Sequence, residues 1–156
     1  MSIKTGQAAP DFKLHNTEKE AVTLSSQKGK NVVLLFFPAA FTSVCTKELC
    51  NFRDNLSRYN DMNAQVFGIS VDMPFTLGEF KKQQNLNFPL LSDFNKEAAT
   101  AYGSIYDSWL MGLKGVAKRS AFVIDKEGNV QYAEVLEDAH NEPDYAKIDA
   151  ALAGLN

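Results

Sequence analysis

The residues best suited to do chemistry in this chain are two cysteines, Cys45 and Cys50, five positions apart. A 156-residue chain does not need a disulfide to fold, so in a reducing compartment such a pair points to catalysis or metal binding. A metal site would have to add His15 and His140, which lie on distant segments. Close pairs of zinc ligands are usually about two to four residues apart, so the spacing argues against a zinc site and favours catalysis.

The position of Cys45 supports a reactive thiol. It follows an apolar run, Val32 to Phe37, and falls in the first turn of an expected helix. Its sulfur would lie near unpaired backbone N–H groups and the positive end of the helix dipole, and both favour the thiolate, which is the nucleophilic form. A free cysteine is also commonly a small buried side chain. Position alone leaves both interpretations open.

The elements that must hold these cysteines are indicated by the spacing of apolar residues. Alternating residues at 12–15 and 22–25 predict a short peripheral hairpin, and Val32 to Phe37 predicts a strand buried on both faces. A helix of about fifteen residues is expected to start near Thr42. Further strands are expected at 65–71, 88–91, 120–125 and 130–136, and further helices at 74–84, 95–102 and 144–155.

This order of elements predicts an α/β fold with a central mixed β-sheet flanked by helices, of the thioredoxin kind. Residues 1–156 are expected to form a single domain, because no linker, repeat or low-complexity tract interrupts them. Residues 103–118 lack a clear pattern and hold Trp109, Met111 and Leu113 between glycines. We expect them to form a structured loop over the active site.

Composition excludes several classes of function. The chain is 45% hydrophobic and 22% charged, which is typical of a globular protein and not of a disordered one. Sixteen basic and nineteen acidic residues give a net charge of -3 without long runs of one sign, so a role with nucleic acid or anionic membranes gains no support. The N-terminus shows no secretion signal, and no apolar stretch approaches the roughly 20 residues that span a bilayer. A cytoplasmic protein is therefore expected.

The residues before Cys45 fit the pattern Pro-x-x-x-Thr-x-x-Cys, with Pro38 and Thr42 at the fixed positions. This pattern resembles the active-site loop of the peroxiredoxins. Segments 9–12, 88–93 and 119–125 resemble the same family in the same order, so that the resemblance covers nearly the whole chain. It implies a thioredoxin-like fold with an N-terminal β-hairpin. It also implies a cofactor-free and metal-free thiol peroxidase in which Cys45 attacks a hydroperoxide.

The resemblance assigns further catalytic residues. Thr42 would hydrogen-bond thiolate and peroxide, although Thr is also a common N-cap, and Pro38 would shield the thiolate, although Pro also ends strands. Arg119, which directly precedes an expected buried strand, would supply the permanent positive charge that the thiolate and the leaving oxygen need. Glu48, where the family holds Glu or Gln, would orient the arginine by hydrogen bonding. A first-turn acid also complements the helix dipole.

The resemblance also gives Cys50 a role. Peroxiredoxins of the bacterioferritin-comigratory type carry a resolving cysteine five residues after the peroxidatic one, and residues 45–54 resemble that signature. Residues 41–44 are closer to one-cysteine peroxiredoxins of the AhpE type, in which an external thiol takes this part. Five residues along a helix separate the Cα atoms by about 8.5 Å, beyond the roughly 7 Å ceiling for a disulfide. Pairing of Cys45 with Cys50 would therefore require the start of the helix to unwind.

The expected partners are a hydroperoxide, organic or inorganic, and a reductant of the thioredoxin or glutaredoxin kind. Neither nucleic acid nor a membrane is expected as a partner. The resemblance also implies a possible homodimer formed through the active-site edge, which would use Phe41 and neighbouring loops.

Overall fold

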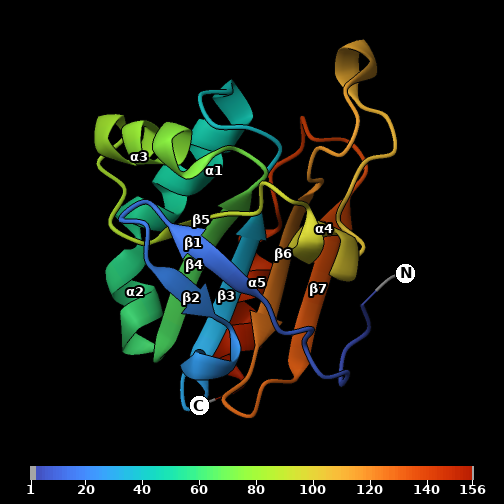
Figure 1. Cartoon of the computed structure of the whole chain (residues 1–156). Coiled ribbons are helices and arrows are strands. Elements are labelled where there is room, and N and C mark those ends of the chain that lie inside the picture. Colours follow the sequence, from blue (N-terminus) through green and yellow to red (C-terminus); the bar gives the residue numbers. More distant parts are fainter. Residues whose placement is uncertain (1–2, 156) are drawn as a thin grey trace.

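The computed structural model describes residues 3–155, which form a seven-stranded mixed sheet flanked by helices (Figure 1). The strand order is β2-β1-β5-β4-β3-β6-β7, so the expected α/β architecture is confirmed. The strands are β1 (Lys13–Asn16), β2 (Ala21–Thr23), β3 (Asn31–Phe36), β4 (Ala64–Ser70), β5 (Leu90–Ser92), β6 (Arg119–Ile124) and β7 (Val130–Leu136). The helices are α1 (Ser43–Asp54), α2 (Leu56–Asp61), α3 (Pro74–Gln83), α4 (Glu97–Ala101) and α5 (Tyr145–Ala153), with short 3-10 turns at Ser25–Gln27 and Leu110–Gly112.

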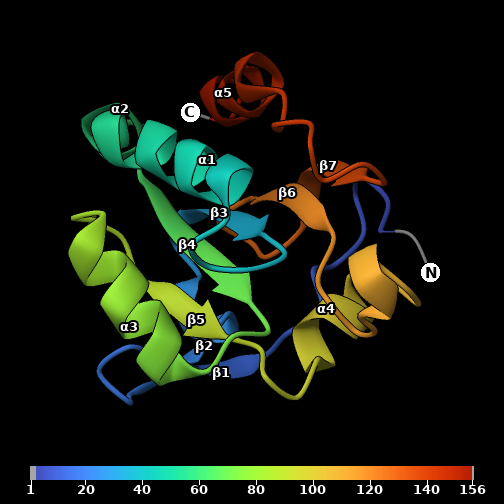
Figure 2. The same cartoon turned by 90° about the horizontal axis from the view of Figure 1, so that it is seen from above.

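The central strand β3 is buried on both faces, as the uninterrupted apolar run predicts. Val33 and Leu35 point to one core, which α1, α2, α3 and α5 cover. Val32 and Leu34 point to the other core, which α4 and the N-terminal segment cover. Figure 2 shows α1, α2 and α5 together on one side of the sheet and α4 on the other. The sheet therefore separates two apolar layers.

The predicted hairpins are both present. β1 pairs antiparallel with β2 at the edge of the sheet, and β6 pairs antiparallel with β7, with an irregularity at Val123/Ile124. β1 also pairs with β5, so the N-terminal hairpin extends the central sheet. Among helices that the structure describes, none is long and apolar enough to cross a membrane.

The expected helix of about fifteen residues is divided in two. α1 ends at Asp54 and α2 begins at Leu56, because Asn55 leaves the helical conformation with φ -114° and ψ 14°. Its side-chain amide donates to the carbonyl of Asn51 at 2.8 Å, the kind of local bond by which Asn competes with helix geometry. α1 therefore has 12 residues.

Two other boundaries differ from the expected ones. α4 starts only at Glu97, because Lys96 adopts a left-handed conformation with φ 64°. The carboxylate of Asp93 then accepts the N–H groups of Ala98 and Ala99. β5 begins at Leu90, after Pro89, which has no N–H to donate to a ladder.

Candidate active site

Cys45 lies at the carboxyl end of β3, in the first turn of α1, with 1% of its surface exposed. It lines a small cavity of about 130 Å³ whose walls come from the preceding loop, the 103–118 loop, the start of β6 and the segment after β7. The 103–118 loop thus covers this site, as expected, through Trp109 and Leu110. The lining residues are Pro38, Thr42, Ser43, Val44, Cys45, Trp109, Leu110, Arg119, Ala139 and His140.

The register of the sheet explains how Arg119, 74 positions away in sequence, reaches Cys45. β6 runs antiparallel to β3, with Phe36 opposite Ser120, so the first residue of β6 lies beside the last residues of β3. α1 starts from this same end of the sheet. A strand and a helix that are distant in sequence therefore deliver Arg119 and Cys45 to one place.

Arg119 is the centre of the polar network at this site. Nη2 donates to Cys45 Sγ at 3.2 Å, and Nη1 donates to Glu48 Oε1 at 2.7 Å. Nε and Nη2 also donate to the carbonyl oxygen of Ala139, at 3.2 Å and 3.0 Å. The side chain is 1% exposed. These contacts fix the plane of the guanidinium so that one N–H points at the sulfur.

Glu48 lies behind Arg119, fully buried, and does not line the cavity. Burial raises the pKa of its carboxyl group to about 7, against the opposing effect of the Arg119 charge. Oε1 accepts the bond from Arg119, whereas Oε2 is buried and has no hydrogen-bond partner among the described residues. One oxygen of this acid is therefore desolvated without compensation.

Thr42 and Pro38 form the loop wall of the cavity. Thr42 occupies the N-cap position of α1, but its hydroxyl donates to the carbonyl of Ala39 at 2.9 Å, and no side-chain capping bond to α1 is found in residues 3–155. Phe41 has φ 68°, a left-handed conformation that is uncommon outside glycine. The N–H of Ala40 donates to Asp72 at 2.8 Å, which ties the loop to the end of β4. The loop is thus fixed by its own bond and by Asp72, while the Thr42 carbonyl accepts the N–H of Thr46 in α1.

Cys50 lies outside this cavity. It sits partly buried on another side of α1, and its thiol donates to Gln84 Oε1, after α3, at 3.6 Å. Both cysteines are free. The intact helix holds them apart, as the spacing predicts. Of the six candidate residues, the cavity gathers Pro38, Thr42, Cys45 and Arg119, Glu48 joins them through Arg119, and Cys50 is separate.

Two groups at the site escape sequence reasoning. The carbonyl of Ala139 anchors Arg119, and His140 lines the cavity with its ring bonded through Nδ1 to Asp138 at 2.8 Å. Both follow β7, and only the tertiary fold brings that segment to Cys45. The sequence offers His140 only as a candidate ligand of a zinc site. Within residues 3–155, no cluster of three or more His, Cys, Asp or Glu side chains could hold a metal ion.

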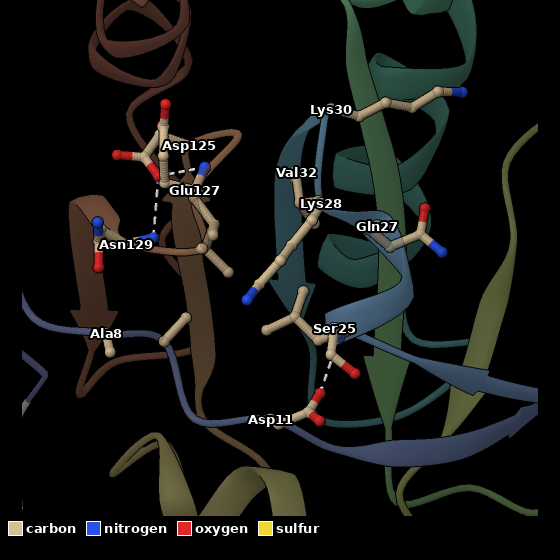
Figure 3. A pocket seen from close by; sticks show the side chains of 14 residues that line it. Ala8, Asp11, Ser25, Gln27, Lys28, Lys30, Val32, Asp125, Glu127 and Asn129 are labelled. Atoms are coloured by element: carbon tan, nitrogen blue, oxygen red, sulfur yellow. Dashed lines mark hydrogen bonds between the residues drawn. The ribbon is translucent and has the colours of Figure 1, made fainter.

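A second cavity, of about 300 Å³, lies at the opposite end of the sheet (Figure 3). Buried aliphatic side chains, among them Val32 and Ile124, form its floor. Its acids serve the backbone: Asp11 accepts the N–H of Ser25, and Asp125 accepts the N–H of Asn129, as the dashed lines in Figure 3 mark. Neither cysteine lines this cavity. This cavity is therefore separate from the Cys45 site.

Comparison with known proteins agrees with this geometry. The model of the AhpC/TSA family matches residues 5–133. The chain belongs to this family and is a peroxiredoxin. It is 40% identical over 144 residues to a putative peroxiredoxin bcp of Coxiella burnetii, covering 90% of this chain and 95% of the relative. It is 38% identical over 136 residues to alkyl hydroperoxide reductase E of Mycobacterium tuberculosis, covering 85% and 86%.

Solved structures of peroxiredoxins share the fold. The crystal structure of peroxidoxin BcpB from Mycobacterium tuberculosis superimposes with a TM-score of 0.83 at 34% identity, covering 98% of this chain and 96% of that one. A peroxiredoxin-like protein from Aquifex aeolicus gives a TM-score of 0.91 at 26% identity, covering 100% and 90%. The peroxiredoxin is accordingly a thiol-dependent peroxidase with a thioredoxin-like fold.

Proposed function

We propose that Cys45 is the peroxidatic nucleophile of this peroxiredoxin. The contact between Arg119 Nη2 and Cys45 Sγ, 3.2 Å long and inside the cavity, carries the proposal. The Cys45 thiolate attacks one oxygen of a hydroperoxide, forms the S–O bond and breaks the O–O bond. The product is a sulfenic acid, and the other oxygen leaves as hydroxide or alkoxide. Arg119 faces both the attacking sulfur and the oxygen on which negative charge develops.

The other residues of the cavity position the reactants. Pro38 is buried and has no N–H, so it excludes water from one wall without presenting a donor. The Thr42 hydroxyl donates to the Ala39 carbonyl and belongs to a residue that lines the cavity; turned toward the peroxide, it would orient the substrate. Glu48 fixes the guanidinium of Arg119 through a charge-assisted bond. No cofactor or metal takes part in this scheme.

Cys50 is proposed as the resolving cysteine. Its thiol condenses with the sulfenic acid of Cys45 to form a disulfide and release water. The reaction requires the first turns of α1 to unwind, since the two cysteines lie five residues apart on an intact helix. The contact of Cys50 with Gln84 favours the competing possibility, in which Cys50 stays in place and an external thiol resolves Cys45.

The substrate and reductant follow from the site and its relatives. Trp109 and Leu110 give the cavity an apolar wall, which suits organic hydroperoxides as well as hydrogen peroxide. The name of the relative alkyl hydroperoxide reductase E agrees with this substrate class. We assign the reducing step to thioredoxin or a glutaredoxin-like protein in the cytoplasm. Residues 1–156 are proposed to work as a single domain, because every strand from residue 3 to 155 joins one sheet.

A homodimer is proposed as the assembly. Large apolar side chains are exposed around the active-site end of the sheet, among them Phe41 at 49%, Leu110 at 50% and Met111 at 89%. Leu110 lines the catalytic cavity, so this surface adjoins the site itself. Exposed apolar patches next to functional sites commonly mark protein interfaces. A second copy of the chain is the occupant that the family resemblance implies.

The experiment that tests the catalytic scheme is intact mass spectrometry after one equivalent of hydrogen peroxide. The wild type is expected to lose about 2 Da as a disulfide forms, and Cys50→Ser is expected to stop at the sulfenic acid, about 16 Da heavier. Cys45→Ser is expected not to react rapidly. Equal rates for Cys45→Ser and wild type would overturn the assignment of Cys45. A wild type that stops about 16 Da heavier would show that Cys50 does not resolve it.

A further inference from the structure

The buried site around Arg119 holds more acidic groups than basic ones. Arg119 bonds Cys45 Sγ at 3.2 Å and Glu48 Oε1 at 2.7 Å, and it is the cation that these two acids share. If both were ionised, the cluster would carry a net negative charge with every member at most 1% exposed. Burying an uncompensated charge is costly, and the cost is avoided when one of the acids keeps its proton.

The surroundings of Glu48 indicate which acid that is. Besides Arg119 of β6, Glu48 faces Glu134 of β7, Glu142 of the segment before α5, and the Tyr145 phenol of α5. Glu142 is itself paired with Lys47 of α1 at 3.0 Å, an exposed ion pair that weakens its effect only in part. Both carboxylates repel negative charge on Glu48, and Tyr145 donates its own hydroxyl to Glu142 at 2.7 Å. Burial together with these neighbours outweighs the attraction of Arg119, so that the pKa of Glu48 rises to about 7.

The unpartnered oxygen of Glu48 agrees with a protonated carboxyl group. Oε1 accepts from Arg119, and Oε2 is the oxygen left without a partner among the described residues. A neutral acid loses far less solvation energy at such a position than a carboxylate does. Cys45, by contrast, has both an Arg119 N–H and the start of α1 to stabilise its anion. Of the two acids, Glu48 is therefore the one that keeps its proton.

We propose that Glu48 holds a proton while Cys45 is a thiolate and gives one up when Cys45 is oxidised. The inference rests on the proposed role of Cys45. The thiolate, the Glu48 carboxylic acid and R–O–O–H become the sulfenic acid, the Glu48 carboxylate and R–O–H. The sulfur loses two electrons, the O–O bond gains them, and the proton released by Glu48 balances the one that the leaving oxygen takes up.

This exchange keeps the charge of the buried cluster constant. Before the reaction Arg119 compensates the thiolate, and afterwards it compensates the Glu48 carboxylate, to which it is already bonded. Formation of the neutral sulfenic acid then leaves no unpaired guanidinium in the core. A glutamine at position 48 would orient Arg119 equally well but could not take part in this exchange. The role is thus specific to the acid.

The test counts protons in a single turnover. The Cys50→Ser protein, which is expected to stop at the sulfenic acid, is mixed with hydrogen peroxide in weak buffer at about pH 8, with a pH indicator as the probe. This pH lies above the Glu48 pKa of about 7, so Glu48 keeps its proton only while the neighbouring thiolate raises that pKa further. The thiolate is measured by its ultraviolet absorbance before mixing. We expect no net proton uptake with Glu48, and uptake of one proton per sulfenic acid formed in the matched Cys50→Ser, Glu48→Gln protein. A merely structural Glu48 would not produce this difference.

Three outcomes would overturn the proposal. These are uptake of one proton per sulfenic acid in the protein that keeps Glu48, equal counts in the two proteins, or absence of thiolate absorbance in the protein with Glu48. The proton count and the thiolate absorbance of the protein with Glu48 need no Glu48 variant. They therefore test the proposal even if the Glu48→Gln protein fails to fold. Infrared difference spectra of the Glu48 protein should also lose the carbonyl band of a protonated carboxyl group on oxidation. Failure to form any sulfenic acid would instead refute the role of Cys45, which the mass of the product reports separately.

Discussion

At the scale of the residue, one guanidinium organises the site. Arg119 uses Nε, Nη1 and Nη2 to bond the Ala139 carbonyl, Glu48 and Cys45. A lysine carries the same charge, but as a compact ammonium it cannot reproduce this planar set of donors. The chemistry therefore depends on the shape of the cation as well as on its charge.

Replacing Arg119 by lysine should slow the reaction of Cys45 with peroxide by about 10²- to 10³-fold, the usual cost of losing one preorganised donor to a developing oxyanion. Stopped-flow fluorescence can follow the reaction, because the single tryptophan, Trp109, lines the cavity. The control is Arg58→Lys, which changes an arginine paired with Asp149 on the surface. A rate for Arg119→Lys within about threefold of wild type would contradict the role of the guanidinium.

The role of the Thr42 hydroxyl can be tested against Thr46, a second threonine four residues later in the first turn of α1. Thr42→Val removes the hydroxyl of a residue that lines the cavity, and Thr46→Val removes one that donates to the Thr42 carbonyl at 2.8 Å. We expect Thr42→Val to lower kcat/KM by about 10- to 100-fold, through lost orientation of the peroxide, with little change in Thr46→Val. Equal losses in the two variants would indicate that Thr42 acts only by holding the loop.

At the scale of the element, helix α1 carries both cysteines, so their pairing depends on whether the helix stays folded. Its first turn places Cys45 against Arg119, and its next turn carries Cys50 toward Gln84. Formation of a Cys45–Cys50 disulfide must open the backbone hydrogen bonds of this part of the helix.

The amides of residues 43–52 should therefore exchange with deuterium much faster in the protein with the Cys45–Cys50 disulfide than in the reduced protein. Oxidised Cys50→Ser serves as the control that keeps the helix. Unchanged protection in a protein whose mass proves the disulfide would refute unwinding.

The turn between β6 and β7 gives a pH-dependent contribution to stability. Burial alone would raise the pKa of Asp125, but bonds from the Asn129 N–H, the Gln131 side chain and the Glu127 N–H lower it below its ordinary value. A lowered folded pKa means that the stabilisation is present above the unfolded value of 3.8 and is lost as the pH falls through the folded value.

Asp125→Asn should therefore destabilise the protein by about 1–2 kcal/mol at neutral pH, and by less in acid. Urea unfolding at neutral and acidic pH measures this difference. Asp61→Asn, at an exposed position at the end of α2, is the control. A destabilisation that does not change with pH would show that the ionisation of Asp125 is irrelevant to the turn.

The elements were largely predictable from the sequence because local patterns determine them. A local pattern of a few residues predicts the apolar strand β3, the amphipathic helix α5 and the turn before β7. Boundaries failed where a single backbone conformation decided them, as at Asn55 and Lys96. The contacts within the active site were harder to predict from the sequence. The family resemblance implied the catalytic role of Arg119. That Arg119 meets Cys45 follows from the β3–β6 register, which local spacing could not show.

The parts of the site contributed by the segment after β7 could not be foreseen. The Ala139 carbonyl and the His140 ring reach the cavity only because β7 returns beside β6 and the chain then crosses over Arg119. A backbone carbonyl leaves no mark in a sequence, and a lone histidine suggests many roles. Nor does composition reveal that Glu48 is fully buried, since acids on helices are usually exposed. The proton balance of the site therefore becomes visible only in three dimensions.

At the scale of the whole molecule, large apolar side chains are exposed near the active-site end of the sheet, where a second copy of the chain could bind. Phe41, Leu110, Met111 and Leu113 are exposed in the loops around the catalytic cavity, whereas Met73, Phe75 and Phe94 are exposed at the start of α3 and after β5. Paired copies would cover this surface and restrict access of solvent to the cavity that Leu110 lines. The edge strand β7, where Val135 is 36% exposed, offers a different route to association, by strand pairing.

A double variant, Leu110→Glu with Met111→Glu, should convert a dimer into a 17.3 kDa monomer, because two charges cannot be buried unpaired in an apolar interface. Sedimentation velocity across a range of concentrations measures the change. Peroxide consumption by the monomer tells whether the covered cavity reacts faster than the open one. Val135→Glu is the control, because it adds a negative charge on the β7 edge, outside the catalytic cavity. If Val135→Glu dissociates the protein and the double variant does not, the copies meet along β7, and the apolar surface at the active site remains open to a different partner, such as the reductant.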